Sequence, residues 1–204
     1  MKLEKLLTRV DAAKARLATI PRILKRFRES VLAAACSGRL TAHWRAQNLN
    51  IESASELLRR IEHKRQLSKA KPRGYQQEDA EMTDKEGQEI PSTWTVARIR
   101  NICVDSFYGP RFGRDEYVAD GVPTIRTTDM TDNGSIVLKD PPTVKVPEDR
   151  LQDFRALKGD LLVTRTGSIG VMAIFKEDYI AIPSAYLIRF RFSPLVIPDY
   201  VFTF

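Results

Sequence analysis

The chain has 204 residues, of which 43% are hydrophobic, so it can bury a core in one or two domains and is not wholly disordered. Its net charge is +7, and the excess lies in residues 1–45, which hold 11 Lys or Arg residues against 3 Asp or Glu residues. No apolar run long enough for a membrane-spanning helix occurs in the sequence, and the charged amphipathic N-terminus lacks the apolar core of a secretory signal.

Apolar residues recur at alternating steps of three and four along residues 3–34, which is the heptad pattern of a coiled coil. We call these residues the heptad seam: Leu3, Leu6, Val10, Ala13, Leu17, Ile20, Leu24, Phe27, Val31 and Ala34. Because an isolated helix is marginal in water, the seam needs a partner, within the chain or on another one.

Pro21 falls inside the seam, so the helix should kink or restart there, and Thr19 is suited to cap a restarted helix. We therefore expect two helices in near-continuous register, at about 2–18 and 20–37. Gly38 fits a left-handed position that ends the second helix, with Leu40 folding back against it.

The basic residues beside the seam, among them Lys25, Arg26 and Arg28, allow three interpretations. They can attract nucleic acid, form the solvated side of a long helix, or meet an acidic partner. The three alanines at residues 33–35 permit close approach of another backbone, but helix propensity alone explains them equally well.

Residues 41–52 are expected to form a polar connector that contains Trp44. Ser53 and Glu56 have the spacing of a capping box, which predicts a third helix at about 54–69. Residues 71–89 have no periodicity and few apolar residues, so we interpret them as a linker or exposed loop.

A second domain is expected from Ile90. There, Trp94 and Val96 should lie on a short strand, and Ile99 and Ile102 on a helical turn. Short runs rich in Val, Ile, Thr and aromatic residues then predict strands: VPTIRTTDM, GSIVLKD, TVKVP, GDLLVTRTGSIGVMAIF and YIAIPSAYLIRFRF. A helical turn is expected at residues 148–157, and IPDYVFTF is interpreted as the opening of a helix.

These elements predict an α+β fold, with long coiled-coil-type helices at the N-terminus followed by a mixed α/β, sheet-rich domain. The predicted divisions are a helical segment at 1–47, a short helix and polar linker at 48–89, and the second domain at 90–204, which we expect to be incomplete at its C-terminal end.

Catalytic signatures are weak. Asp140-Pro141-Pro142-Thr143 resembles the Asp/Asn-Pro-Pro-aromatic motif of amino-methyltransferases, but Thr143 cannot stack on a base and no glycine-rich cofactor loop is present. A Pro-Pro turn before a strand is the preferred interpretation. Glu62-His63-Lys64 has a nuclease-like form, yet it falls on a predicted helix.

Neither His43 nor His63 has neighbours suited to zinc, and Cys36 and Cys103 lack metal-like spacing. The cysteines are interpreted as reduced structural thiols of a cytoplasmic protein. We expect no catalytic residue, no metal site and no cofactor bound by this chain.

Several loops of the second domain carry groups that can contact DNA, because arginine reads guanine in a bidentate manner and hydroxyls or backbone amides bind phosphates. The candidates are Tyr108, Arg111, Arg114, Arg126, Thr127, Thr128, Arg165, Thr166 and Ser168. Gly167-Ser168-Ile169-Gly170 is either a phosphate-clamping loop or an ordinary hairpin turn.

The stretch IPRILKRFRESVLAAACSGRLTAHWR resembles the conserved helical region of the specificity (S) subunits of type I restriction-modification enzymes. The blocks IPSTWTVARIRNIC, GVPTIRTTDM and LKGDLLVTRTGSIGVMAIF are similar, in the same order, to parts of that family's target recognition domain. The resemblance covers nearly the whole chain except residues 49–89, and it suggests the middle and second half of a longer subunit, or a half-length one.

The resemblance implies a non-catalytic, DNA-binding specificity subunit that recognises half of a bipartite site on double-stranded DNA. It also implies partners: methyltransferase (M) subunits that bind S-adenosylmethionine, and translocase-nuclease (R) subunits. The helix that would dock partners carries Leu17, Ile20, Leu24, Phe27, Val31 and Ala34, and self-association through the N-terminal helices is a further expectation. The alternative is a truncated coiled-coil adapter that reads no DNA sequence.

Overall fold

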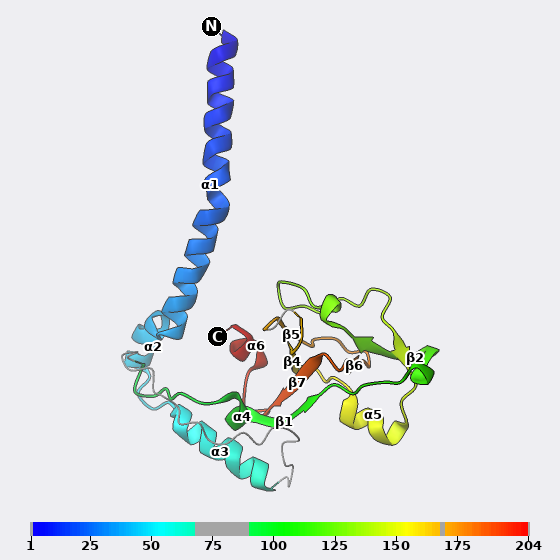
Figure 1. The fold of residues 1–204 in the computed structure, drawn as a ribbon. Coiled ribbons are helices and arrows are strands. Elements are labelled where there is room, and N and C mark those ends of the chain that lie inside the picture. The colour runs from blue at the N-terminus through cyan, green and yellow to red at the C-terminus, as the bar shows by residue number, and fades with distance from the viewer. Residues whose placement is uncertain (1, 68–89, 168–169, 204) are drawn as a thin grey trace. The chain divides into compact units, whose positions relative to one another are not determined.

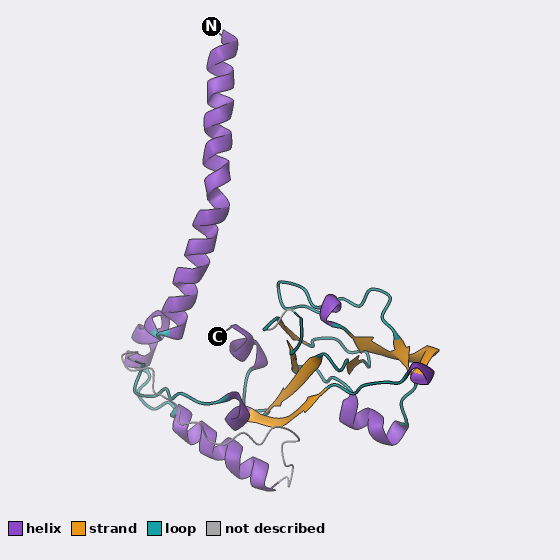
Figure 2. Cartoon of the chain, viewed as in Figure 1, coloured by secondary structure: helices purple, strands orange, loops and turns teal. Residues whose placement is uncertain are grey.

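The computed structural model describes residues 2–67, 90–167 and 170–203, which form two compact units (Figures 1 and 2). The first unit comprises residues 2–51 and 90–94, and the second comprises residues 52–67 and 95–203. The linker predicted at 71–89 lies outside the described residues. Of the helices in the described part of the chain, none has the length and apolar composition needed to cross a bilayer.

Helix α1 (Lys2–Cys36) is continuous and contains Pro21, so the prediction of two helices divided at this proline is wrong (Figure 1). The Thr19 hydroxyl donates to the carbonyl oxygen of Arg16 at 2.7 Å and does not cap a new helix. A proline removes only one backbone donor, and strong helix formers on both sides sustain the helix through it. The ribbon changes direction about half-way along α1, as expected for a proline-containing helix.

The heptad seam is exposed along α1. Leu17 and Phe27, for example, are 62% and 64% exposed. The described residues of the first unit therefore include no partner that covers the seam.

Gly38 ends the first helical segment with a φ of 76°, as predicted, and its N–H donates to the carbonyl oxygen of Ala35 at 2.9 Å. An added Cβ would lie 2.5 Å from Cγ of Pro91, so this site excludes other residues by space as well as by conformation. Leu40 is 59% exposed, and its expected folding back against the helix stays a prediction.

A 3₁₀ turn (Arg39–Thr41) runs into helix α2 (Ala42–Gln47), which occupies the first half of the connector predicted at 41–52. Arg45 lies 5.7 Å from the ring centroid of Trp94. The strand predicted around Trp94 and Val96 is not formed, because the backbone turns at Pro91, whose carbonyl oxygen accepts from the N–H of Trp94.

The second unit begins with helix α3 (Ala54–Leu67), which agrees with the predicted third helix as far as residue 67. The N–H of Glu56 donates to Oγ of Ser53 at 3.3 Å, as the capping box requires. A short helix, α4 (Ile99–Ile102), follows where a helical turn was expected.

Two sheets form the centre of this unit. The first has the antiparallel order β1-β7-β4-β5, with strands β1 (Cys103–Tyr108), β7 (Leu187–Phe192), β4 (Leu161–Thr164) and β5 (Met172–Ile174). The second has the order β3-β2-β6, with strands β3 (Thr143–Val144), β2 (Tyr117–Ile125) and β6 (Ile182–Pro183). Helix α5 (Glu148–Phe154) and helix α6 (Pro198–Thr203) occupy the positions predicted for helical turns.

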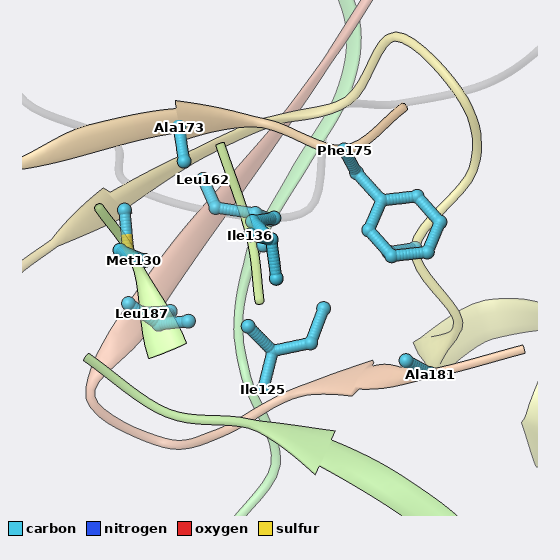
Figure 3. Packing of buried hydrophobic residues seen from close by; sticks show 9 residues of the cluster. Ile125, Met130, Ile136, Leu162, Ala173, Phe175, Ala181 and Leu187 are labelled. Atoms are coloured by element: carbon cyan, nitrogen blue, oxygen red, sulfur yellow. The ribbon is translucent and has the colours of Figure 1, made fainter. Parts of the chain in front are cut away.

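The larger sheet is covered on both faces, because successive side chains of a strand point to opposite sides. Leu162 and Leu187 join Ile125 of the second sheet in one core, shown in Figure 3. Leu161 and Phe192 lie in the other core, against which Val201 and Phe202 of α6 pack.

A second predicted strand is also absent, and one observed strand was not predicted. GSIVLKD contributes a single bridge, between Met130 and Ile136, because Thr131 and Ser135 exchange hydrogen bonds in a local turn. Strand β1 carries Asp105 and Ser106, which sequence reasoning did not associate with a sheet.

The guanidinium of Arg189, in the middle of β7, is 1% exposed. Nη1 donates to the carbonyl oxygens of Asp153 and Arg155 at 3.1 and 2.8 Å, and Nη2 donates to the carboxylate of Asp105. Its Cζ lies 4.1 Å from the ring centroid of Phe107. Burial and the neighbouring Arg191 lower the pKa of Arg189 from its usual value.

Asp160, the residue directly before β4, extends this network. It accepts from Nε and Nη2 of Arg191 at 2.9 and 2.7 Å and from the N–H of Leu157 at 2.8 Å. The network therefore ties β1, β7 and the end of α5 together across long distances in the sequence.

Replacing Arg189 by Met should destabilise the protein by about 3–5 kcal/mol, because Asp105 would stay half-buried without its cation and Asp160 would lose the more distant of its two cations, Nε of Arg189 at 3.7 Å. Urea unfolding followed by circular dichroism measures the loss. Arg150→Met is the matched control: Arg150 lies 4.9 Å from the Phe154 ring at the surface, and its loss should cost less than about 1 kcal/mol. Equal losses for the two variants would contradict the structural importance of Arg189.

The two thiols should differ in reactivity. Burial, with a contribution from Asp105, raises the pKa of Cys103 to about 12, so this thiol stays protonated at pH 8. A chromogenic disulfide reagent at pH 8 should titrate only Cys36, which is half-buried, in the native protein and both thiols after denaturation. In a Cys36→Ser variant, rapid native reaction at Cys103 would contradict the described packing.

Candidate nucleic-acid interface

Loops from both sheets converge at one end of the four-stranded sheet. Tyr108, at the end of β1, pairs with Ile188, and Thr164, at the end of β4, pairs with Leu187. Ile125, at the end of β2, is connected to the same point because its carbonyl oxygen accepts from the N–H of Ser184 at 2.9 Å. The segments that follow β1, β2 and β4 therefore start close to the beginning of β7.

Arg165 and Tyr108 come together at this end of the sheet. The guanidinium carbon of Arg165 lies 4.5 Å from the Tyr108 ring centroid, which is the geometry of a cation–π contact. Tyr108 is 43% exposed, and Arg165 is exposed too. The ring thus orients the arginine while leaving its donors open to solvent, where they can meet a phosphate or a guanine edge.

The loop between β4 and β5 projects from the sheet. Thr164 closes it, since its N–H donates to the carbonyl oxygen of Val171 and its Oγ1 accepts from the N–H of Val171. Gly167 and Gly170 have φ values of 80° and 86°, with no atom near their added Cβ positions. Thr166 is exposed on this loop, whereas Ser168 lies outside the described residues.

The predicted strand-to-strand turn is thus present at this loop. Its described part leaves both interpretations of Gly167-Ser168-Ile169-Gly170 open, because two of the four residues are not described.

Arg126 is held by its own turn. Its Nε and Nη2 donate to the carboxylate of Asp129 at 3.1 and 2.9 Å, and Nη2 also donates to the carbonyl oxygen of Lys139 at 2.8 Å. The hydrogen bond to Asp129 raises the pKa of Arg126. This fork positions the 3₁₀ turn Thr127–Asp129, on which Thr127 is half-buried and Thr128 is exposed.

Arg111 and Arg114 are exposed on the segment that leads from β1 to β2. The structure describes no hydrogen bond or ring contact that joins either of them to Arg165, Tyr108 or Arg126. Of the predicted residues that the structure describes, Arg165 and Tyr108 are in direct contact. The residues Arg126, Thr127 and Thr128 form a separate turn, and Arg111 and Arg114 lie on the connecting segment.

Gly109 allows the segment after β1 to pack directly against the backbone between β6 and β7. Its N–H donates to the carbonyl oxygen of Leu187 at 3.0 Å. A Cβ at this position would lie 2.0 and 2.3 Å from the carbonyl oxygens of Ser184 and Pro183, so only glycine allows the two loops to approach so closely.

Tyr186 was not selected by sequence reasoning. Its carbonyl oxygen accepts from the N–H of Arg165 at 3.0 Å, and its side chain is 59% exposed. In the sequence, the feature that could have indicated Tyr186 is an aromatic residue directly before an arginine-containing strand. Only the pairing of β4 with β7 places this residue beside Arg165.

The other motifs have structural roles. The carbonyl oxygen of Pro142 accepts from both N and Oγ1 of Thr124 at 2.9 Å, and β3 follows directly, as expected, whereas the bend lies at Lys139 and Asp140, just before the two prolines. Glu62 forms an ion pair with Arg65 on α3. Within residues 2–67, 90–167 and 170–203, no three metal-binding side chains gather in one place.

No protein-family model matches the chain. The EcoBI specificity subunit of a type I restriction enzyme from Escherichia coli is 32% identical over 181 residues, which cover 87% of this chain and 32% of that protein. The StySPI specificity subunit of Salmonella potsdam is 68% identical over 40 residues, 20% of this chain and 9% of that protein. The solved HsdS subunit from Thermoanaerobacter tengcongensis has 16% identity and a TM-score of 0.47, covering 89% of this chain and 39% of that one.

Gly109→Ala should destabilise the second unit by about 1–3 kcal/mol, because the methyl group collides with backbone oxygens that cannot rotate away. Gly113→Ala is the control, since the nearest atom to its added Cβ is a carboxylate oxygen of the exposed Asp115, 2.8 Å away. Thermal unfolding of both variants tests the difference. A Gly113 variant as unstable as the Gly109 variant would contradict the close approach of the two loops.

Proposed function

Because the chain is homologous to specificity subunits of type I restriction enzymes and spans about a third of the EcoBI subunit's length, we propose that it supplies DNA sequence recognition to such an enzyme. The curated relatives are specificity subunits by name, in keeping with a chain that performs no chemistry itself. The observation that carries the proposal is the exposed Arg165–Tyr108 pair at the loop end of the four-stranded sheet.

Double-stranded DNA would lie against this loop end. Arg165, oriented by Tyr108, would contact a base edge or phosphate, and Thr166 and Thr128 would add hydroxyl contacts. Ser168, Arg111 and Arg114 remain candidates on neighbouring segments. Arg126 and Thr127 would act chiefly by positioning the turn, because the Arg126 guanidinium is bound by Asp129 and the Lys139 carbonyl.

The charge distribution supports a division of labour between the two parts of the chain. Residues 91–204 have 14 basic and 14 acidic residues, so this part would read DNA through a few placed contacts and not through bulk attraction. Helix α1, of 35 residues and thus roughly 50 Å long, would serve as a spacer and docking element.

The partners follow from the proposed role. Methyltransferase subunits carrying S-adenosylmethionine would dock on the exposed face of α1, including Leu24, Val31 and Ala34, and translocase-nuclease subunits would join them. The complex would act in the cytoplasm, where its DNA is found, and this chain would recognise half of a bipartite site.

Selection from a random double-stranded DNA pool, with methyltransferase subunits present, tests sequence reading. We expect one enriched motif. Without enrichment, the chain would instead be a coiled-coil adapter that reads no sequence.

Arg165→Ala should weaken binding to the selected motif by about 1–3 kcal/mol and relax the preference at one base position if the arginine reads a base. A loss that is uniform across unrelated sequences would identify a phosphate contact. Arg59→Ala, at an exposed arginine on α3, is the matched control and should leave the motif unchanged. Competition gel shifts at fixed salt measure both effects, and an unchanged motif and affinity for Arg165→Ala would exclude it from the interface.

A further inference from the structure

Arg165 and Tyr186 lie opposite each other at the end of the four-stranded sheet. Strands β4 and β7 pair Thr164 with Leu187. The hydrogen bond from the N–H of Arg165 to the carbonyl oxygen of Tyr186, at 3.0 Å, continues this register by one more pair. Directly opposite residues of an antiparallel sheet place their side chains on the same face, with Cβ atoms about 4.5–5.5 Å apart. The two side chains are therefore neighbours on one face.

This face changes from buried to exposed toward the loop end of the sheet. Alternate residues of a strand share a face. Along β4 and its extension, Leu161 is buried, Val163 is half-buried and Arg165 is exposed. Along β7 and the residue before it, Phe190 is half-buried and Tyr186 is exposed. Tyr186 thus continues an apolar row beyond the core against which α6 packs.

The backbone of Tyr186 is fixed, whereas its ring is open to solvent. The N–H of Leu187 donates to the carbonyl oxygen of Ser184 at 3.0 Å and closes a turn around Tyr186. Tyr186 is the most exposed tyrosine that the structure describes, and no hydrogen bond or ring contact joins its side chain to another described residue. The ring of Tyr108, by contrast, is covered by Arg165. A ring on a fixed backbone loses little conformational freedom when a ligand covers it.

We infer that Tyr186 is a second base-reading residue of the proposed DNA interface and that its ring contacts the C5 methyl group of a thymine. The inference rests on the proposed function and adds the chemistry of one contact. The ring carries no charge, so it cannot replace a counterion as a basic phosphate contact does. The thymine methyl is the apolar group that base edges present in the major groove, and it matches an apolar ring.

The position of Tyr186 also determines which thymine it can reach. Cβ atoms of opposite residues lie about 4.5–5.5 Å apart, and successive bases of one strand are separated by roughly 3.4 Å along the helix axis. The thymine should therefore lie within about two base pairs of the position that Arg165 contacts.

Duplex oligonucleotides carrying the motif selected by the wild-type protein test this contact, with methyltransferase subunits present. Each thymine of the motif is replaced in turn by uracil, which removes only the methyl group. At one position uracil should weaken wild-type binding by about fourfold, the factor expected for one buried methyl group. The Tyr186→Ala variant should bind thymine and uracil duplexes equally. Tyr186→Phe should keep the discrimination, because the ring and not the hydroxyl makes the contact.

Tyr200→Ala is the matched control, at an exposed tyrosine on α6, and should discriminate thymine from uracil as the wild type does. Thermal unfolding of Tyr186→Ala should resemble that of the wild type, because the side chain it removes is exposed. The uracil comparison on the wild-type protein does not depend on the stability of any variant.

The inference fails if no thymine responds to uracil, if Tyr186→Ala still discriminates, or if the sensitive thymine lies far from any position that Arg165→Ala relaxes. A kink in the duplex that Tyr186→Ala abolishes, without a uracil effect, would identify the ring as a wedge between bases and would also overturn it. The absence of any selected motif would overturn the proposed function. A motif without a uracil effect would overturn only the role of Tyr186.

Discussion

The second unit depends on a buried arginine. Arg189 brings a cation into the middle of the four-stranded sheet, where Asp105, two backbone carbonyls and the Phe107 ring surround it. A desolvated guanidinium is tolerated when most of its donors are used and its charge is opposed. Both Nη atoms of Arg189 donate hydrogen bonds, whereas its Nε has no hydrogen-bond partner among the described residues. The contacts of Arg189 come from β1 and from the end of α5, so the charge that is costly to bury also fixes which segments must meet.

That constraint positions the candidate interface. With β7 in register against β1 and β4, Ile188 pairs with Tyr108 and Leu187 pairs with Thr164, so the loops leaving those strands share one end of the sheet. Gly109 then allows the β1 loop to touch the backbone at Ser184. The exposed Arg165 is therefore carried by paired strands, which in the proposed function would favour a defined contact with DNA over a diffuse one.

Helix α1 differs from the second unit because its apolar seam residues are largely exposed, and no described residue of the first unit covers them. Its heptad period is typical of a helix that pairs with another helix. The proposed function thus divides the chain into two roles. Placed donors on a neutral domain would distinguish bases, whereas α1 would dock partner subunits.

Local patterns were sufficient for some elements. The heptads predicted a long helix, the Gly38 conformation followed from its position after that helix, and the Val- and Ile-rich runs predicted most of the strands. They failed where local hydrogen bonds competed with the pattern, as at Thr131 and Ser135, and where one proline was outweighed by its helical neighbours.

Arg165 and Arg189 show what sequence patterns cannot predict. Both are arginines in or beside strands, yet one is exposed on a tyrosine and the other is buried against an aspartate 84 residues away. The sequence alone determined the helix, the strand-rich domain and the placement of charge along the chain. Only the tertiary structure decided which arginine holds the sheet together and which is left for a ligand, because burial depends on neighbours that the chain brings together from far apart.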